Sequence, residues 1–74
     1  MIDKPAFGFG LVYADTLIYC EALMSDSSYL ILFNSKPIIE LCLNDYFRWV
    51  PIAGTIIPSE IVNEIGYRIE NYYC

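Results

Sequence analysis

The sequence predicts an α+β fold, in which a small antiparallel sheet of four to five strands forms a meander and one C-terminal helix packs on one face. Two patterns support this. Residues 58–73 alone have a clear helical periodicity, and residues 8–50 break into short apolar runs separated by turn-forming residues. Because a single amphipathic helix needs a surface on which to bury its apolar stripe, the preceding strands should form a sheet beneath it.

The C-terminal helix is predicted over residues 58–73. Pro58 suits the first helical turn, where its missing N–H costs nothing, and Glu60 lies near the positive end of the helix dipole. Gly66, at the margin of the stripe, would let the sheet approach closely, and Tyr67 should lie on the opposite, acidic side. The apolar stripe has helical spacing and comprises Ile61, Val62, Ile65, Ile69, Tyr72 and Tyr73.

The 74 residues should form a single domain, with an N-terminal arm over 1–7, strands and hairpins over 8–50, and a loop over 51–57 that leads into the helix. Turn-forming residues at 15–16, 25–28, 34–37 and 44–45 separate the strands. The expected strands are 11–14, 17–24, 29–33, 38–43 and 46–50.

Hairpin registers then sort the side chains onto two faces. Loops over 25–27, 34–37 and 44–45 give one aliphatic face, which is the natural bed for the helix: Ile18, Cys20, Ala22, Leu30, Leu32, Ile39, Leu41, Leu43 and Val50. The other face is aromatic and uncovered: Leu17, Tyr19, Glu21, Leu23, Tyr29, Ile31, Phe33, Ile38, Glu40, Cys42, Phe47 and Trp49. A slip of one residue in any hairpin would exchange the faces of that strand. The alternative to an exposed aromatic face is that the helix covers it or that the N-terminal arm folds over it.

The composition favours burial against another molecule. Hydrophobic residues make up 57% of the chain, against roughly 45–50% in typical soluble domains. A small chain has much surface for its volume, so the excess indicates a homo-oligomer or a partner, with a tightly packed monomer as the alternative. The net charge of −5, with four basic residues, argues against direct binding to nucleic acid.

The residues for common catalytic chemistry are missing from the sequence. There is no histidine, and the cysteines at 20, 42 and 74 have neither metal-site nor disulfide spacing. We therefore expect no catalytic residues, cofactor or metal, and reduced thiols. Glu21 and Glu40 should both lie beside Ile31, where charge recognition is a better reading than acid–base catalysis. Without a signal-peptide pattern or a long apolar run, a cytoplasmic protein without a membrane span is expected.

These observations predict a small acidic, non-catalytic protein that acts by protein–protein binding. No family motif is evident, but the character suits inhibitors or neutralisers, such as phage anti-CRISPR or anti-restriction proteins, antitoxins and immunity proteins, acting in the host cytoplasm if phage-encoded. The partner would have a basic surface. The alternative is a structural homo-oligomer, such as a homodimer, whose aromatic sheet faces pack together without an external partner. The predicted partner-binding residues are Tyr19, Glu21, Tyr29, Phe33, Glu40, Phe47, Trp49 and Tyr67.

Overall fold

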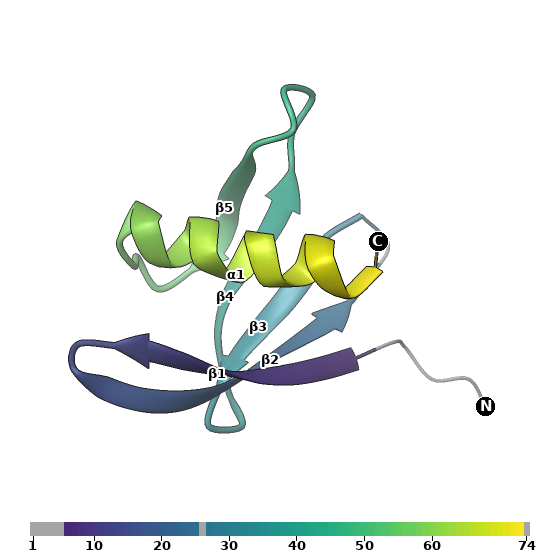
Figure 1. Ribbon diagram of the computed structural model, residues 1–74. Coiled ribbons are helices and arrows are strands. Elements are labelled where there is room, and N and C mark those ends of the chain that lie inside the picture. The colour runs from purple at the N-terminus through teal and green to yellow at the C-terminus, as the bar shows by residue number, and fades with distance from the viewer. Residues whose placement is uncertain (1–5, 26, 74) are drawn as a thin grey trace.

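The computed structural model describes residues 6–25 and 27–73, and it has the predicted α+β architecture. An antiparallel sheet of five strands has the order β1-β2-β3-β4-β5, so the expected meander is confirmed. One helix, α1, crosses one face of this sheet (Figure 1). The elements are β1 (Ala6–Tyr13), β2 (Thr16–Met24), β3 (Tyr29–Phe33), β4 (Lys36–Leu43), β5 (Trp49–Gly54) and α1 (Ser59–Tyr73).

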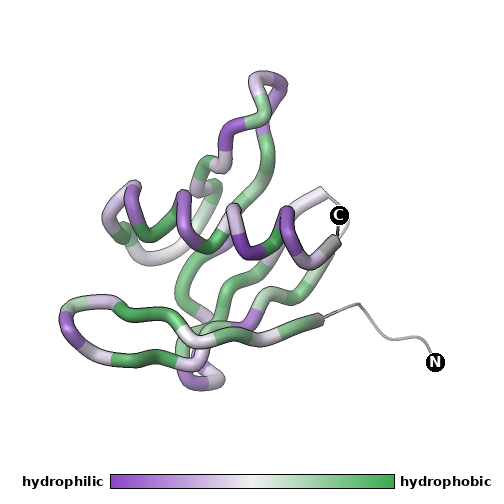
Figure 2. Tube along the Cα trace, viewed as in Figure 1, coloured by the Kyte–Doolittle hydropathy of each residue, from purple (hydrophilic) through white to green (hydrophobic). Residues whose placement is uncertain are grey.

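Helix α1 begins one residue later than predicted. The carbonyl of Pro58 accepts hydrogen bonds from the N–H groups of Ile61 and Val62, at 3.0 and 3.1 Å. Pro58 is therefore the N-cap residue and not the first residue of the helix. The expected stripe is buried, with Ile65 and Ile69 at most 2% exposed. Apolar and polar residues alternate from turn to turn along the helix (Figure 2).

The hairpin between β1 and β2 closes one residue earlier than predicted. Ala14 and Asp15 have φ angles of 55° and 61°, which is the two-residue turn whose twist matches that of the strands. Tyr13 consequently pairs with Thr16, and β1 extends back to Ala6. Residues 6 and 7 of the predicted arm therefore belong to the sheet, and residues 1–5 lie outside the described part of the chain.

Strand β3 is turned over relative to the prediction. The loop before it spans 25–28 and not 25–27, so Leu23 pairs with Leu30 and not with Tyr29. The loop after it contains two residues and not four, since positive φ angles at Asn34 and Ser35 form a second tight turn. Leu32 pairs with Pro37 but Ile31 pairs with Ile39, so β4 has one extra residue, a bulge, at this point. The bulge shifts the register of the strand pair by one residue.

Strand β5 also differs from the prediction, because the loop before it is longer. The side chain of Asn44 accepts hydrogen bonds from the backbone N–H groups of Tyr46 and Arg48, at 2.9 and 3.0 Å, and this fixes a loop over residues 44–48. Strand pairing resumes at Trp49, opposite Leu43, and continues to Gly54 through the predicted loop region. Pro51 is accommodated because β5 is an edge strand, where a missing N–H breaks no sheet hydrogen bond.

The core lies between α1 and the sheet and has an aliphatic centre with an aromatic margin. Tyr29 and Trp49 meet edge to face at 5.5 Å between ring centroids, and Tyr13 and Phe33 do so at 6.1 Å. Rings at these positions fill the space that a single helix leaves over a wide sheet. The buried apolar residues are Leu11, Cys20, Ala22, Ile31, Phe33, Ile39, Leu41, Ile57, Val62, Ile65 and Ile69.

Candidate binding surface

The sheet face that points away from α1 is the candidate binding surface, and we call it the uncovered face. Within residues 6–25 and 27–73, no helix or strand lies over it (Figure 1). Its outermost apolar side chains are well exposed: Leu17 by 73%, Val12 by 66% and Tyr19 by 52%. Strand alternation and the observed registers assign this face Val12, Leu17, Tyr19, Glu21, Leu23, Leu30, Leu32, Glu40, Cys42, Val50 and Ala53.

Two glycines in β1 let side chains from β2 lie flat on this face. A Cβ atom at Gly8 would stand 2.1 Å from the Tyr19 Oη, so the tyrosine ring occupies that space. A Cβ at Gly10 would meet only Leu17 Cδ1, at 3.4 Å. Covering a strand glycine with a neighbouring aromatic ring stabilises the strand pair. The side of the uncovered face over β1 is therefore smooth and apolar.

Glu40 provides a polar point in the middle of the uncovered face. Its carboxylate accepts a hydrogen bond from the Ser28 hydroxyl, at 2.5 Å. Two shallow hollows of about 220 and 190 Å³ adjoin it, and Leu30 and Glu40 line both. A carboxylate beside apolar hollows is suited to a partner that presents an Arg or Lys next to an aliphatic side chain.

Glu21 shares this face, but it does not form the predicted pair with Glu40 around Ile31. Glu21 is opposite Leu32, whereas Glu40 is opposite Leu30. Ile31 points to the other side of the sheet and is fully buried. The two carboxylates are therefore separate acidic points on one surface.

The prediction that the exposed face is aromatic is wrong for three residues. Tyr29 and Phe33 face α1, because the loop before β3 is one residue longer than predicted and a bulge in β4 shifts the register on the other side by one residue. Trp49 faces α1 because pairing resumes after a loop of five residues, 44–48, and not of two. Its indole N–H donates a hydrogen bond to Glu70 of α1, at 2.8 Å. These rings stabilise the fold and are not part of the uncovered face.

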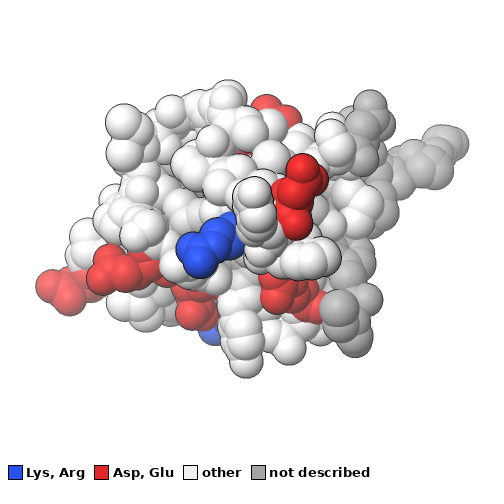
Figure 3. Space-filling model, turned by 90° about the horizontal axis from the view of Figure 1, so that it is seen from above, with Lys and Arg blue, Asp and Glu red and all other residues white. Residues whose placement is uncertain are grey.

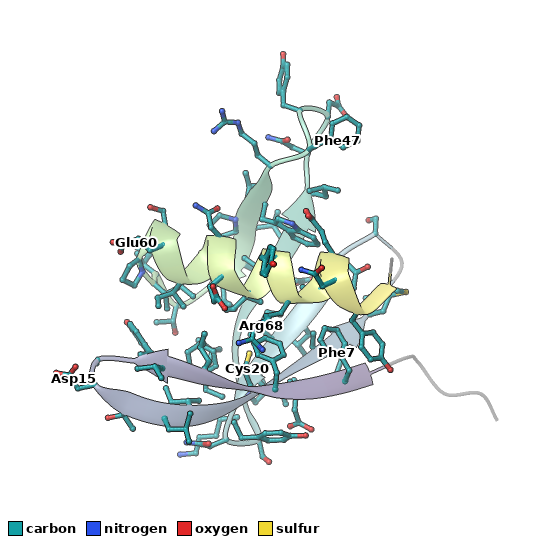
Figure 4. The ribbon with its side chains drawn as sticks, in the orientation of Figure 1. Phe7, Asp15, Cys20, Phe47, Glu60 and Arg68 are labelled. Carbon is teal, nitrogen blue, oxygen red and sulfur yellow. The ribbon has the colours of Figure 1, made fainter. Side chains whose placement is uncertain are left out.

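The last two predicted residues are exposed, but at other places. Phe47 lies at the tip of the β4–β5 hairpin with φ 61°, away from the body of the molecule (Figure 4). It is 80% exposed, and the adjacent Tyr46 is 81% exposed. Tyr67 lies on the outer side of α1 and is 61% exposed. Of the predicted residues, only Tyr19, Glu21 and Glu40 thus share the uncovered face.

Sequence reasoning missed Val12, Leu30, Leu32 and Val50 as members of this face. The signal for Val12 was the two-residue turn itself, because a turn at either 15–16 or 14–15 puts Val12 on the face of Leu17 and Tyr19. Leu30 and Leu32 lie on this face because the loop before β3 has four residues and not three, so that Leu23 pairs with Leu30. On the other side of β3, a bulge in β4 shifts the pairing by one residue, and this bulge gave no signal in the sequence. A four-residue loop over 25–28 would have assigned β3 to its observed faces relative to β2.

The electrostatics of the described residues are simple. Burial, and to a smaller extent the charge of Glu21, raises the pKa of the Cys20 thiol to about 12.

No group of His, Cys, Asp and Glu side chains within residues 6–25 and 27–73 is placed to hold a metal ion. Acidic side chains outnumber basic ones on the surface seen from above (Figure 3). Among the same described residues, no helix is both long and apolar enough to cross a membrane.

Comparison with known protein families, with curated proteins and with solved structures finds no match to this chain.

Proposed function

We propose that this protein acts by non-catalytic protein–protein binding, through the uncovered face of its sheet. The single observation that carries this proposal is the exposure of Leu17, Val12 and Tyr19 on one continuous side of the sheet. Contiguous apolar surface of this kind is typical of interaction sites. Glu21 and Glu40 add two acidic points, so a partner with basic residues beside an apolar patch is the best match.

Within this class we propose an inhibitor or neutraliser of the partner, of the phage anti-defence, antitoxin or immunity type. Small size, a charge of −5 and an apolar recognition surface support this choice. The surface is aliphatic with one tyrosine, so its affinity would come from close packing over a broad area more than from aromatic anchors.

The test is capture of proteins from the native host by the tagged chain, with matched surface variants. Leu17→Ser and Tyr19→Ser should each abolish capture of a specific protein, because both remove exposed apolar area from the uncovered face without touching the core. Ile56→Ser is the control, since Ile56 is 93% exposed and lies in the link between β5 and α1. Equal capture by all three variants and the native chain would refute this site.

A homodimer that packs two uncovered faces together is the second candidate, and the apolar character of the face supports it as well. Light scattering over a concentration series separates the two candidates. A dimer that Leu17→Lys dissociates, and Ile56→Lys does not, would identify self-association as the use of the face. A protein that stays monomeric at all concentrations would exclude self-association and support the external partner.

A further inference from the structure

We propose that the groove between α1 and the free edge of β1 binds an extended peptide segment of another protein, with a basic side chain, as an additional strand of the sheet. We call this the edge groove. Its volume is about 360 Å³; β1 contributes Gly10, Leu11 and Val12, and α1 contributes Glu60, Ile61, Glu64 and Arg68. It opens on the α1 side of the sheet edge and shares Val12 with the uncovered face, but the proposal is independent of the function proposed above.

The backbone of β1 is arranged to accept another strand. A two-residue turn makes the flanking pair, Tyr13 and Thr16, exchange hydrogen bonds, and the pattern then alternates along the strands. Gly8, Gly10 and Val12 consequently turn their N–H and C=O groups to the open edge. The backbone of Tyr19 in β2 bonds to Asn34 on the opposite side, which agrees with this alternation.

Of the two edges of the sheet, that of β1 is the receptive one. Natural edge strands are usually protected from pairing by charged residues, prolines or bulges. Strand β5 contains Pro51 and a bulge opposite residues 40 and 41 of β4. Strand β1 has none of these: Ala6–Tyr13 is uncharged, lacks proline and pairs with β2 without interruption over all eight of its residues.

The walls of the groove set the chemistry of the occupant. Ile61 is half-buried beside Leu11, so side chains of an added strand that point toward α1 would meet apolar surface. Glu60 and Glu64 stand above it on successive turns of α1. Arg68 pairs with Glu64 at 3.0 Å and also lies over the ring of Phe9, 5.2 Å from its centroid.

Glu60 is the carboxylate left for a ligand. Neither a hydrogen bond nor an ion pair from another described side chain reaches it, whereas Glu64 is held by Arg68. Glu60 lies at the same end of the molecule as Asp15 of the β1–β2 turn, and Arg68 points from α1 toward β1 nearer the middle (Figure 4). A Lys or Arg of the added strand would therefore be bound at the Glu60 end of the groove.

Charge complementarity also argues against a second copy of this chain as the occupant. Antiparallel pairing of two β1 edges about a two-fold axis would place both helices on the same side of the joined sheet. The two-fold axis would put Glu60 of the two copies at opposite ends of the joined edge, and β1 of the second copy has no basic residue to pair with Glu60. A different chain with a basic extended segment supplies the cation that a second copy lacks.

The probe for the test is the acetylated, amidated peptide Thr-Val-Arg-Val-Thr-Val, titrated into the isotopically labelled full chain and followed by amide NMR shifts. We expect the largest shifts at residues 8, 10 and 12 of β1 and along the facing side of α1. A peptide with Glu in place of Arg should bind about tenfold more weakly. A peptide N-methylated at alternate residues, which cannot pair with the edge, should not bind.

Two variants complete the test. Glu60→Gln should weaken binding of the Arg peptide and remove its preference over the Glu peptide, whereas Glu21→Gln, on the uncovered face, should change neither. Three results would overturn the proposal: shifts confined to the uncovered face, no binding at about 1 mM peptide, or a dimer in solution whose interface is the β1 edge. The N-methylated peptide leaves the protein unaltered, so the test does not depend on a variant that must fold.

Discussion

The indole of Trp49 lies directly against Gly66, and this contact joins the last strand to the helix. A Cβ atom at Gly66 would stand 2.2 to 2.5 Å from Cδ1, Cγ and Nε1 of the indole ring. The same Nε1 donates a hydrogen bond to Glu70, one turn further along α1. Only glycine at position 66 allows the ring to approach this closely, and so the glycine that weakens the helix also permits its main contact with β5.

Gly66→Ala should destabilise the protein, although alanine is the better helix former. Overpacking costs about 1–3 kcal/mol and the gain in helix propensity is about 1 kcal/mol, so we expect the free energy of unfolding to fall by about 1 kcal/mol. Urea denaturation followed by Trp49 fluorescence measures this. Asn63→Ala, at an exposed helix position, is the control and should raise the free energy of unfolding slightly. Equal stabilisation by both variants would contradict the contact.

Ile31→Ala and Leu30→Ala together test the register of β3. Ile31 is fully buried under α1, and its truncation should cost about 2–5 kcal/mol of unfolding free energy. Leu30 is half-buried on the uncovered face, and its truncation should cost about 1 kcal/mol. Thermal and urea denaturation of both variants give the comparison. The reverse order of costs would mean that β3 has the register predicted from the sequence.

Gly8→Ala and Gly10→Ala test the position of the Tyr19 ring. Alanine at position 10 meets Leu17 at an ordinary contact distance and should stabilise the strand by about 0.5–1 kcal/mol. Alanine at position 8 must displace the ring and should give no such gain. In a Tyr19→Ser background the gain at position 8 should appear. A gain at position 8 with Tyr19 intact would place the ring elsewhere.

Cys20 should make the protein less stable at high pH. Its pKa is raised from 9.0 to about 12 in the folded state, so the folded protein keeps a proton that the unfolded chain loses. The stabilisation from the neutral buried thiol is complete below pH 9 and disappears as the pH rises toward 12, by about 4 kcal/mol over the whole window. Because tyrosines ionise in the same range, the measured quantity is the difference in pH dependence between the native chain and Cys20→Ala. A difference that does not change with pH would contradict burial of the thiol.

The reactivity of the thiols gives a second measure of the same burial. At pH 8, a disulfide reagent should modify the half-buried Cys42 readily, whereas Cys20 should react only as fast as the protein opens. Denaturant should make Cys20 as reactive as Cys42. Rapid modification of Cys20 in the folded protein would place it outside the core.

The candidate surface could be predicted from the sequence only in part. Alternation within β2 and β4 correctly separated Tyr19, Glu21 and Glu40 from Cys20 and Leu41, because a strand keeps its own period regardless of its neighbours. Which alternate set of β3 faces the helix depended on whether the loop before it had three or four residues, and on the bulge in β4. Serine-rich and asparagine-containing loops allow several lengths, and a change of one residue exchanges the two faces.

The sequence by itself determined the element types, their order and the need for an uncovered face, because one helix of 15 residues cannot lie on both sides of a sheet. Only the tertiary structure decided that this face is aliphatic. Tyr29, Phe33 and Trp49 have more apolar area to bury than Leu30, Leu32 and Val50, whose predicted places they take, and the space around the isoleucines of α1 accommodates their rings. The edge groove is likewise tertiary in origin, since it exists only where α1 and β1, from opposite ends of the chain, are brought together.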